Sequence, residues 1–154
     1  MLGARFLFRA WGTVALLALV AVMARAVPRN EPTVDELKAR LSSLSIGDRP
    51  HLCVQIAKKQ LAEADKFYVA ADIEKGQAAL TDVVAYSELA RDYAIQSHKY
   101  QKQSEIAVRV MTRKLTEILH SLGHDDQAPV QDAINRMQRV RDDLLKTMFP
   151  KGAK

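Results

Sequence analysis

Residues 77 to 122 contain neither glycine nor proline, the two residue types that most often end helices. Apolar and small side chains recur there every three or four residues, as on one face of a helix. This face comprises Ser104, Val108, Met111, Leu115, Ile118 and Leu122, and it has the same helical angle as Tyr86, Tyr93 and Tyr100. The pattern predicts one long central helix over about 73–122. A break within the polar segment 96–103 is the alternative.

Capping residues mark the start of two further helices. Thr33 and Glu36 form a capping box, and Asp48 stands before Pro50, a residue that suits the first helical turn. Together with the apolar repeats, they predict helices over about 34–45, 49–71 and 128–149 beside the long one. No alternating run of β-branched residues indicates a strand. We therefore expect an all-α fold, an antiparallel helical bundle or a set of hairpins, in a single domain over residues 33–149.

Two neighbouring helical faces consist mostly of small side chains. The first face comprises Cys53, Ala57, Leu61, Ala64 and Tyr68; the second comprises Ile73, Gly76, Leu80, Val84, Ser87, Ala90 and Ala94. Asp72 lies between them as a candidate N-cap, so we expect the chain to reverse direction there. Because small side chains let two helix axes approach closely, the pattern predicts a tight antiparallel hairpin with Gly76 at a point of close contact.

The segment AEADKFYVAADIEKGQAALTDVVAYSELA, residues 62–90, resembles the helical hairpins of tetratricopeptide-type proteins and of uncharacterised exported α-helical proteins of bacteria. The resemblance covers one hairpin and implies a fold without implying a reaction. No second copy follows at a period near 34 residues, whereas stacked repeats usually need about three units. A solenoid is therefore not expected, and no functional residue is transferred from these families.

The N-terminal segment has the features of an export signal. Two arginines precede an apolar run of about 15 residues, which ends at the small-x-small site Ala24-Arg25-Ala26. The run is shorter than the roughly 18 to 20 residues that cross a bilayer as a helix. We expect a signal peptide over 1–26, cleaved after Ala26, then a short linker over 27–32 and an exported protein, periplasmic or secreted. An uncleaved anchor is the alternative, and membrane contact would then involve this segment alone.

The predicted signal and the remaining chain differ in net charge. Removing residues 1–26 removes three arginines and leaves 20 basic against 18 acidic residues, a net charge of +2. Binding to nucleic acid normally needs a concentrated basic surface, so we expect no nucleic-acid partner. A candidate basic patch comprises Arg109, Arg113 and Lys114 of the long predicted helix and Arg136, Arg139 and Arg141 of the last predicted helix. Carboxylates four residues away predict weak surface pairs; a basic patch for an acidic polymer or lipid head groups is the alternative.

Several residue types that often carry chemistry have a structural interpretation here. The only cysteine, Cys53, shares a face with alanines, which predicts a buried thiol; an intermolecular disulfide is the alternative. Glu117 and His120 have the E-x-x-H spacing of di-iron bundles, but they lie on the outer face and have no second pair. His124 follows Gly123, which indicates a helix end rather than a zinc site. We predict no catalytic, cofactor-binding or metal site, and therefore no enzyme.

The tyrosines supply the candidate interaction surface, which comprises Tyr86, Leu89, Tyr93 and Tyr100. Tyrosines in line on one helix are favoured both in cores and at binding surfaces. The predicted helix over 34–45 is the favoured cover for Tyr86 and Tyr93, and a second subunit or a partner helix is the alternative. Tyr100 is expected to lie covered near Phe149.

These features predict a non-catalytic exported protein, an interaction or structural module of the bacterial cell envelope. Its partner would be a second copy of the chain or an envelope protein. The alternative function is a sensor or stress-related bundle that binds a small apolar molecule or an unfolded chain between its helices. In that case Met111, Met137 and Met148 would form an adaptable lining.

Overall fold

A computed structural model describes residues 31–150, and these residues fold into helices. In chain order the elements are α1 (Val34–Leu41), α2 (Arg49–Val69), α3 (Ile73–Ser97), α4 (Gln101–Ser121), the 3-10 helix η1 (His124–Asp126) and α5 (Gln127–Met148). The described part of the chain contains no strand, so the all-α prediction is confirmed. The helix boundaries agree with the predicted ones, except that α1 ends earlier, at Leu41, and that the long helix is divided.

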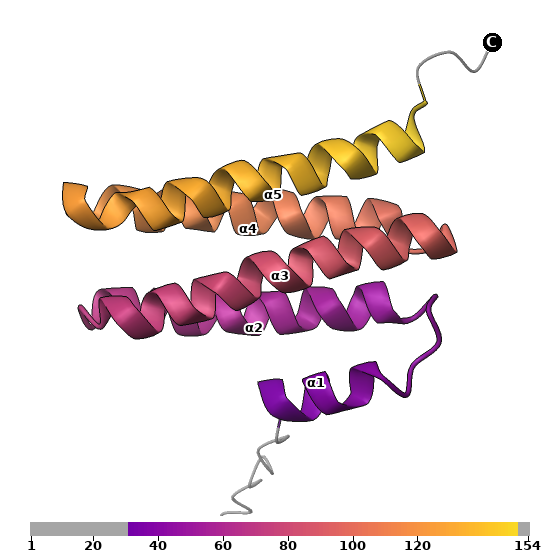
Figure 1. The fold of residues 1–154 in the computed structure, drawn as a ribbon, viewed down its shortest axis with the longest axis horizontal. Coiled ribbons are helices and arrows are strands. Elements are labelled where there is room, and N and C mark those ends of the chain that lie inside the picture. Colours follow the sequence, from indigo (N-terminus) through magenta and orange to yellow (C-terminus); the bar gives the residue numbers. More distant parts are fainter. Residues whose placement is uncertain (1–30, 151–154) are drawn as a thin grey trace, which may run out of the picture. The chain divides into compact units, whose positions relative to one another are not determined.

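The helices pack as two hairpins with a short helix beside them (Figure 1). Helix α2 packs extensively on α3, and α4 packs on α5. The two hairpins meet along α3 and α5 on one side of the bundle and along α2 and α4 on the other. Helix α1 packs on α2. The fold is therefore a four-helix bundle with one additional helix.

The prediction of one continuous helix over about 73–122 is wrong. The chain turns between α3 and α4, where His98 and Tyr100 have left-handed backbone angles, with φ of 56° and 60°. This conformation is unfavourable for residues with a Cβ, by roughly 1–2 kcal/mol each. The turn lets the apolar face of α4 pack into the same core as α3, and a straight helix would leave part of that face exposed to water. Burial thus offsets the local strain.

The turn between α2 and α3 lies where the sequence predicts it. The Asp72 carboxylate accepts a hydrogen bond from the backbone N–H of Lys75 at 3.3 Å, and Ala71 has a left-handed φ of 58°. At Gly76 a Cβ atom would lie 2.9 Å from the Tyr68 ring, closer than real side chains pack. The predicted close contact between the two helices is confirmed, because only a residue without a side chain fits beside that ring.

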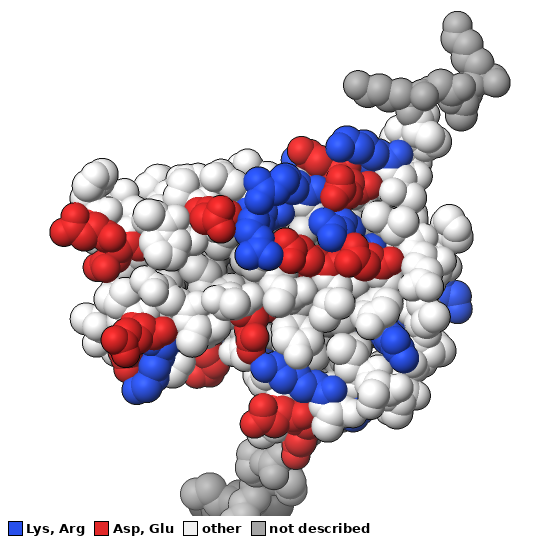
Figure 2. Space-filling view, viewed as in Figure 1, with Lys and Arg blue, Asp and Glu red and all other residues white. Residues whose placement is uncertain are grey.

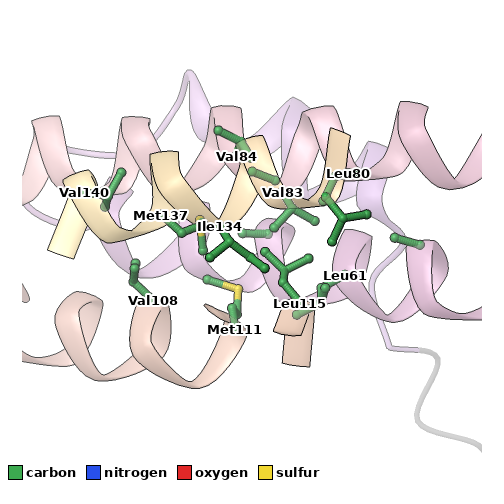
Figure 3. Close-up of a cluster of buried hydrophobic side chains, with 14 of the residues drawn as sticks. Leu61, Leu80, Val83, Val84, Val108, Met111, Leu115, Ile134, Met137 and Val140 are labelled. Carbon is green, nitrogen blue, oxygen red and sulfur yellow. The ribbon is translucent and has the colours of Figure 1, made fainter. Parts of the chain in front are cut away.

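Apolar side chains from α2, α3, α4 and α5 meet in one core (Figure 3). Those labelled there are Leu61, Leu80, Val83, Val84, Val108, Met111, Leu115, Ile134, Met137 and Val140. A second cluster surrounds Cys53, which is fully buried between Ala90 and Ala107. Burial raises the pKa of the Cys53 thiol to about 12, although nearby Arg49 partly opposes the shift. The predicted buried, uncharged thiol is confirmed.

The predicted signal peptide over 1–26 lies outside the described residues, as do most of the linker over 27–32 and of the disordered tail expected over 150–154. The chain divides between Glu31 and Pro32 into two units, and the helices belong to the second. Among the described helices, none combines the length and the apolar character that crossing a membrane requires.

Candidate functional site

The structure divides the predicted interaction surface into two parts. Tyr86, Leu89 and Tyr93 lie half-buried on α3. Tyr86 packs against the cluster around Leu37 of α1, and the Lys38 ammonium lies 5.4 Å from the centre of its ring. Helix α1 thus covers Tyr86, as the favoured prediction has it. Burial, the largest cause, raises the pKa of the Tyr86 hydroxyl.

Tyr93 is covered mainly from the start of α2. The guanidinium of Arg49 lies 5.2 Å from the centre of its ring, and Leu41 and Val54 belong to the same cluster. A cation over a ring face is attracted by the ring's electrons, and both groups are partly removed from water here. The region around Tyr86 and Tyr93 is therefore already covered within one chain.

Tyr100 lies apart from the other two tyrosines, in the turn before α4. Its ring packs at a centroid distance of 5.8 Å on the ring of His51 from α2, and the residue is 36% exposed. Phe149 is itself 70% exposed, so the expectation that it covers Tyr100 is wrong. The reversal at residues 98–100 directs Tyr100 toward the start of α2 instead.

Tyr100 marks one end of a groove between α2 and α4. His51 packs on Tyr100 at that end, and the Lys114 ammonium pairs with the Asp65 carboxylate at 3.0 Å at the other. The two pairs have the same separation along the chain, so α2 and α4 run parallel and in register (Figure 1). Lys58 lies midway between the ends. We call this region the α2–α4 groove.

The groove consists of two hollows that adjoin at Lys58. The first, of about 260 Å³, is lined by His51, Val54, Gln55, Lys58, Tyr100, Gln103, Ser104 and Ala107. The second, of about 300 Å³, is lined by Lys58, Leu61, Ala62, Asp65, Val110, Met111 and Lys114. Val110 is 55% exposed, and Ile106, one turn earlier on α4, is 40% exposed. The groove therefore combines an accessible apolar floor with polar walls.

Two polar groups in the groove lack partners within the described chain. The Ser104 side chain is buried in the first hollow, and its hydroxyl oxygen has no hydrogen-bond partner there. The Lys58 ammonium makes no ion pair with another residue of the 31–150 range. Nearby Lys114 differs, because its hydrogen bond to Asp65 raises its pKa. The middle of the groove thus presents one uncompensated positive charge.

Charges elsewhere on the bundle are paired between helices. On the face shown in Figure 2, blue and red side chains alternate over α3 and α5. Pairs that join different helices include Arg136 with Glu88 at 2.8 Å, Arg91 with Asp143 at 3.2 Å, Arg141 with buried Glu105 at 2.8 Å, and Lys38 with Asp82 at 2.7 Å. These pairs replace most of the predicted pairs four residues apart, of which Glu105 to Arg109 remains, at 3.9 Å. Carboxylates thus neutralise much of the candidate basic patch.

The residues with metal-ligand spacing in the sequence do not form a cluster in the described part of the chain. Glu117, His120 and His124 are exposed, and Glu117 lies 3.7 Å from the Lys114 ammonium. Within residues 31–150, no group of three or more His, Cys, Asp or Glu side chains is placed to hold a metal ion. Gly123 has an ordinary φ of −62° and lies in the connection between α4 and η1, so it belongs to a helix end as expected.

No protein-family profile, curated protein or solved structure matches the chain. The candidate site therefore depends on geometry alone. Sequence reasoning found Tyr100, but it missed the α2–α4 groove, because the groove requires α2 and α4 to be parallel neighbours. The polar segment 96–103 is the signal that indicated this arrangement, since a break there is what brings α4 beside α2.

Proposed function

We propose that the protein is a non-catalytic interaction module of the bacterial cell envelope and that it contacts its partner through the α2–α4 groove. The observation that carries the proposal is the groove itself: two adjoining hollows with an apolar floor, beside exposed Ile106 and Val110. Exposed apolar side chains that gather beside a groove are typical of binding sites for other molecules.

The chemistry of the groove favours binding over catalysis. Its titratable side chains are His51, Lys58, Asp65, Tyr100 and Lys114, and Asp65 is paired with Lys114. A nucleophile with an adjacent base oriented by a third group is not assembled from the groove residues. Met137 is fully buried in the core, and Met111 reaches only the floor of the second hollow, so neither methionine indicates a separate ligand chamber between the helices.

Site-specific photocrosslinking tests the proposal in a bacterium that produces the chain. A benzoylphenylalanine in place of Gln55, on the groove wall, should form a crosslinked product, and the same group at exposed Gln131 of α5 should not. The product from position 55 should disappear in a Val110→Arg variant whose thermal midpoint is unchanged. Equal products from both positions, or no product from position 55, would contradict the groove as the contact surface.

The envelope location has its own test. Mass spectrometry of the exported protein should find Val27 as the first residue, because the small-x-small site ends at Ala26. A protein that keeps Met1 and stays in the membrane fraction would instead be anchored. A protein that keeps Met1 in the cytoplasm would contradict export.

A further inference from the structure

The dimensions of the α2–α4 groove match those of a single helix. The end pairs His51–Tyr100 and Asp65–Lys114 are separated by fourteen residues on each helix, which corresponds to about 21 Å at 1.5 Å per residue. This is the length of about four helical turns. An open channel between two helices commonly accepts the apolar face of a third one, because side-chain ridges then fill the space between the two walls.

The apolar surfaces of the groove have the spacing of a helical repeat. Val54 contributes to the floor of the first hollow and Leu61 to that of the second. They lie two turns apart on α2, about 10 Å along the axis. On an incoming helix, two apolar side chains seven residues apart face the same side at the same spacing. One such side chain is therefore able to enter each hollow.

Lys58 sets the charge of the occupant. It lies between the two hollows and lacks an ion-pair partner among residues 31–150, whereas Lys38, Lys114, Arg136 and Arg141 are all paired. A carboxylate midway between the two apolar side chains of the incoming helix would meet this ammonium. Partial removal from water strengthens such a pair relative to one on an open surface.

A second copy of the same chain fits this charge poorly. Two copies that bring their grooves together across a two-fold axis would also bring their two Lys58 side chains together. Like charges placed opposite each other are unfavourable, and the groove's one carboxylate, Asp65, is already paired with Lys114. A symmetric groove-to-groove dimer therefore does not supply the occupant.

We propose that the α2–α4 groove binds one amphipathic helix of a partner protein, with two apolar side chains seven residues apart in the two hollows and an Asp or Glu between them on Lys58. The inference rests on the proposed function and specifies the partner's binding segment.

A synthetic peptide tests the inference. The probe is a fluorescein-labelled alanine- and glutamine-rich peptide of about 18 residues, long enough to be helical, with Leu at two positions seven apart and Glu at the position between them. Fluorescence anisotropy should show saturable binding to the folded protein. Changing the peptide's Glu to Gln should weaken binding by about threefold and changing it to Lys by more, as expected for a partly exposed ion pair.

The charge at position 58 of the protein is then reversed. Lys58→Glu should weaken binding of the Glu peptide by about threefold or more and should strengthen binding of the Lys peptide. Lys146→Glu, an equal change on the exposed end of α5, should alter neither affinity. Lys58 makes no ion pair within residues 31–150, and the pair of exposed Lys146 with Asp143 is long, at 3.6 Å, so both variants should melt at about the wild-type temperature.

The peptide and crosslinking results together distinguish failure of the acidic-helix inference from failure of the proposed function. If binding does not depend on Lys58, or if no peptide binds at all, the inference that the groove binds an acidic amphipathic helix is wrong. If photocrosslinking at position 55 still succeeds in that case, the groove is a contact surface for a partner of another shape. If decanoate displaces the peptide and itself binds in a Lys58-dependent manner with higher affinity, the groove is a small-amphiphile site and the inference is wrong.

Discussion

Helix α2 packs on α3 along one side and on α4 along another, and these two contacts differ in kind. Toward α3 it presents a face of small and apolar side chains that includes Ala57 and Ala64, and Gly76 of α3 touches the Tyr68 ring. Toward α4 it presents Gln55, Lys58 and other longer polar side chains, and the two helices touch only sparsely. Long side chains with charged ends must keep those ends in water, and so they hold a groove open.

The comparison shows that one helix can specify both a closed and an open contact through side-chain size and charge. Small residues on both sides of the α2–α3 contact let the helix axes approach, and the loss of water from apolar surface stabilises the pair. On the α2–α4 side the apolar floor remains, but polar walls prevent closure. We therefore expect the α2–α3 contact to contribute more to stability, and the α2–α4 groove to tolerate the substitutions that a binding surface needs.

The largest effect is expected from enlarging a small side chain on the closed side. Ala64→Leu places three further carbon atoms in a fully buried position and should lower the free energy of unfolding by about 2 to 3 kcal/mol. The matched control is Ala62→Leu on the same helix, where the side chain lines the groove and should cost less than about 0.5 kcal/mol. Urea unfolding measures both. Equal losses would mean that the two sides of α2 are packed alike.

A smaller loss is expected at Gly76. Gly76→Leu forces the Tyr68 ring to move, but it also gains helix propensity of about 1 kcal/mol, so the net loss should be about 1 to 2 kcal/mol. Gly76→Ala should lie between this variant and the wild type, because even its Cβ meets the ring. Thermal melting of the three proteins tests the order. A stabilised Gly76→Leu variant would show that the α2–α3 contact has space for a larger side chain at this position.

The third prediction concerns alkaline pH. Burial holds the Cys53 thiol neutral up to a pKa of about 12, whereas the unfolded thiol ionises near 9.0. The resulting stability is present below pH 9 and falls as the pH rises from 9 toward 12, by at most about 1.4 kcal/mol per pH unit. Cys53→Ala should lose less stability over this range than the wild type. Identical slopes would indicate that water reaches Cys53 through the first hollow of the groove.

The smallest effect is expected on the open side. Asp65→Asn removes the ion pair that joins α2 to α4 through Lys114, and it should leave the thermal midpoint unchanged within error. The same substitution should increase the affinity for an acidic peptide, because the groove then loses its carboxylate. A marked fall in the thermal midpoint would mean that this pair, rather than the core, holds the two helices together.

Local patterns predict most of the fold. The capping box at Thr33 forms as expected, with Glu36 and Thr33 bonded to each other's backbone N–H groups at 2.9 and 3.3 Å, and the Asp72 cap and the small-residue faces are also found where the sequence places them. These features depend on residues close in sequence or on helical period alone. The break at His98 and Tyr100 was the alternative rather than the favoured prediction, because the sequence offers no Gly or Pro there and tertiary burial offsets the cost of two left-handed residues.

The candidate site was less predictable than the fold for the same reason. Tyr86 and Tyr93 have a helical spacing that suits either a core or a partner, and the docking of α1 decides between them. The groove combines Lys58 of α2 with Val110 of α4, which are brought together by the turn that the pattern did not require. A constellation of this kind becomes visible only when the order of helices around the bundle is known.

The pairing of each helix with its neighbour in the chain has a consequence for the order of folding. Since α2 pairs with α3 and α4 with α5, most contacts join residues close in sequence, and such topologies fold within milliseconds or faster. Each hairpin is able to form on its own short timescale, and the sparse contact between α2 and α4 then forms last. In stopped-flow experiments, a fluorophore pair across α2 and α3 should therefore report before a pair across α2 and α4. The proposed contact surface would thus be the last part of the bundle to assemble.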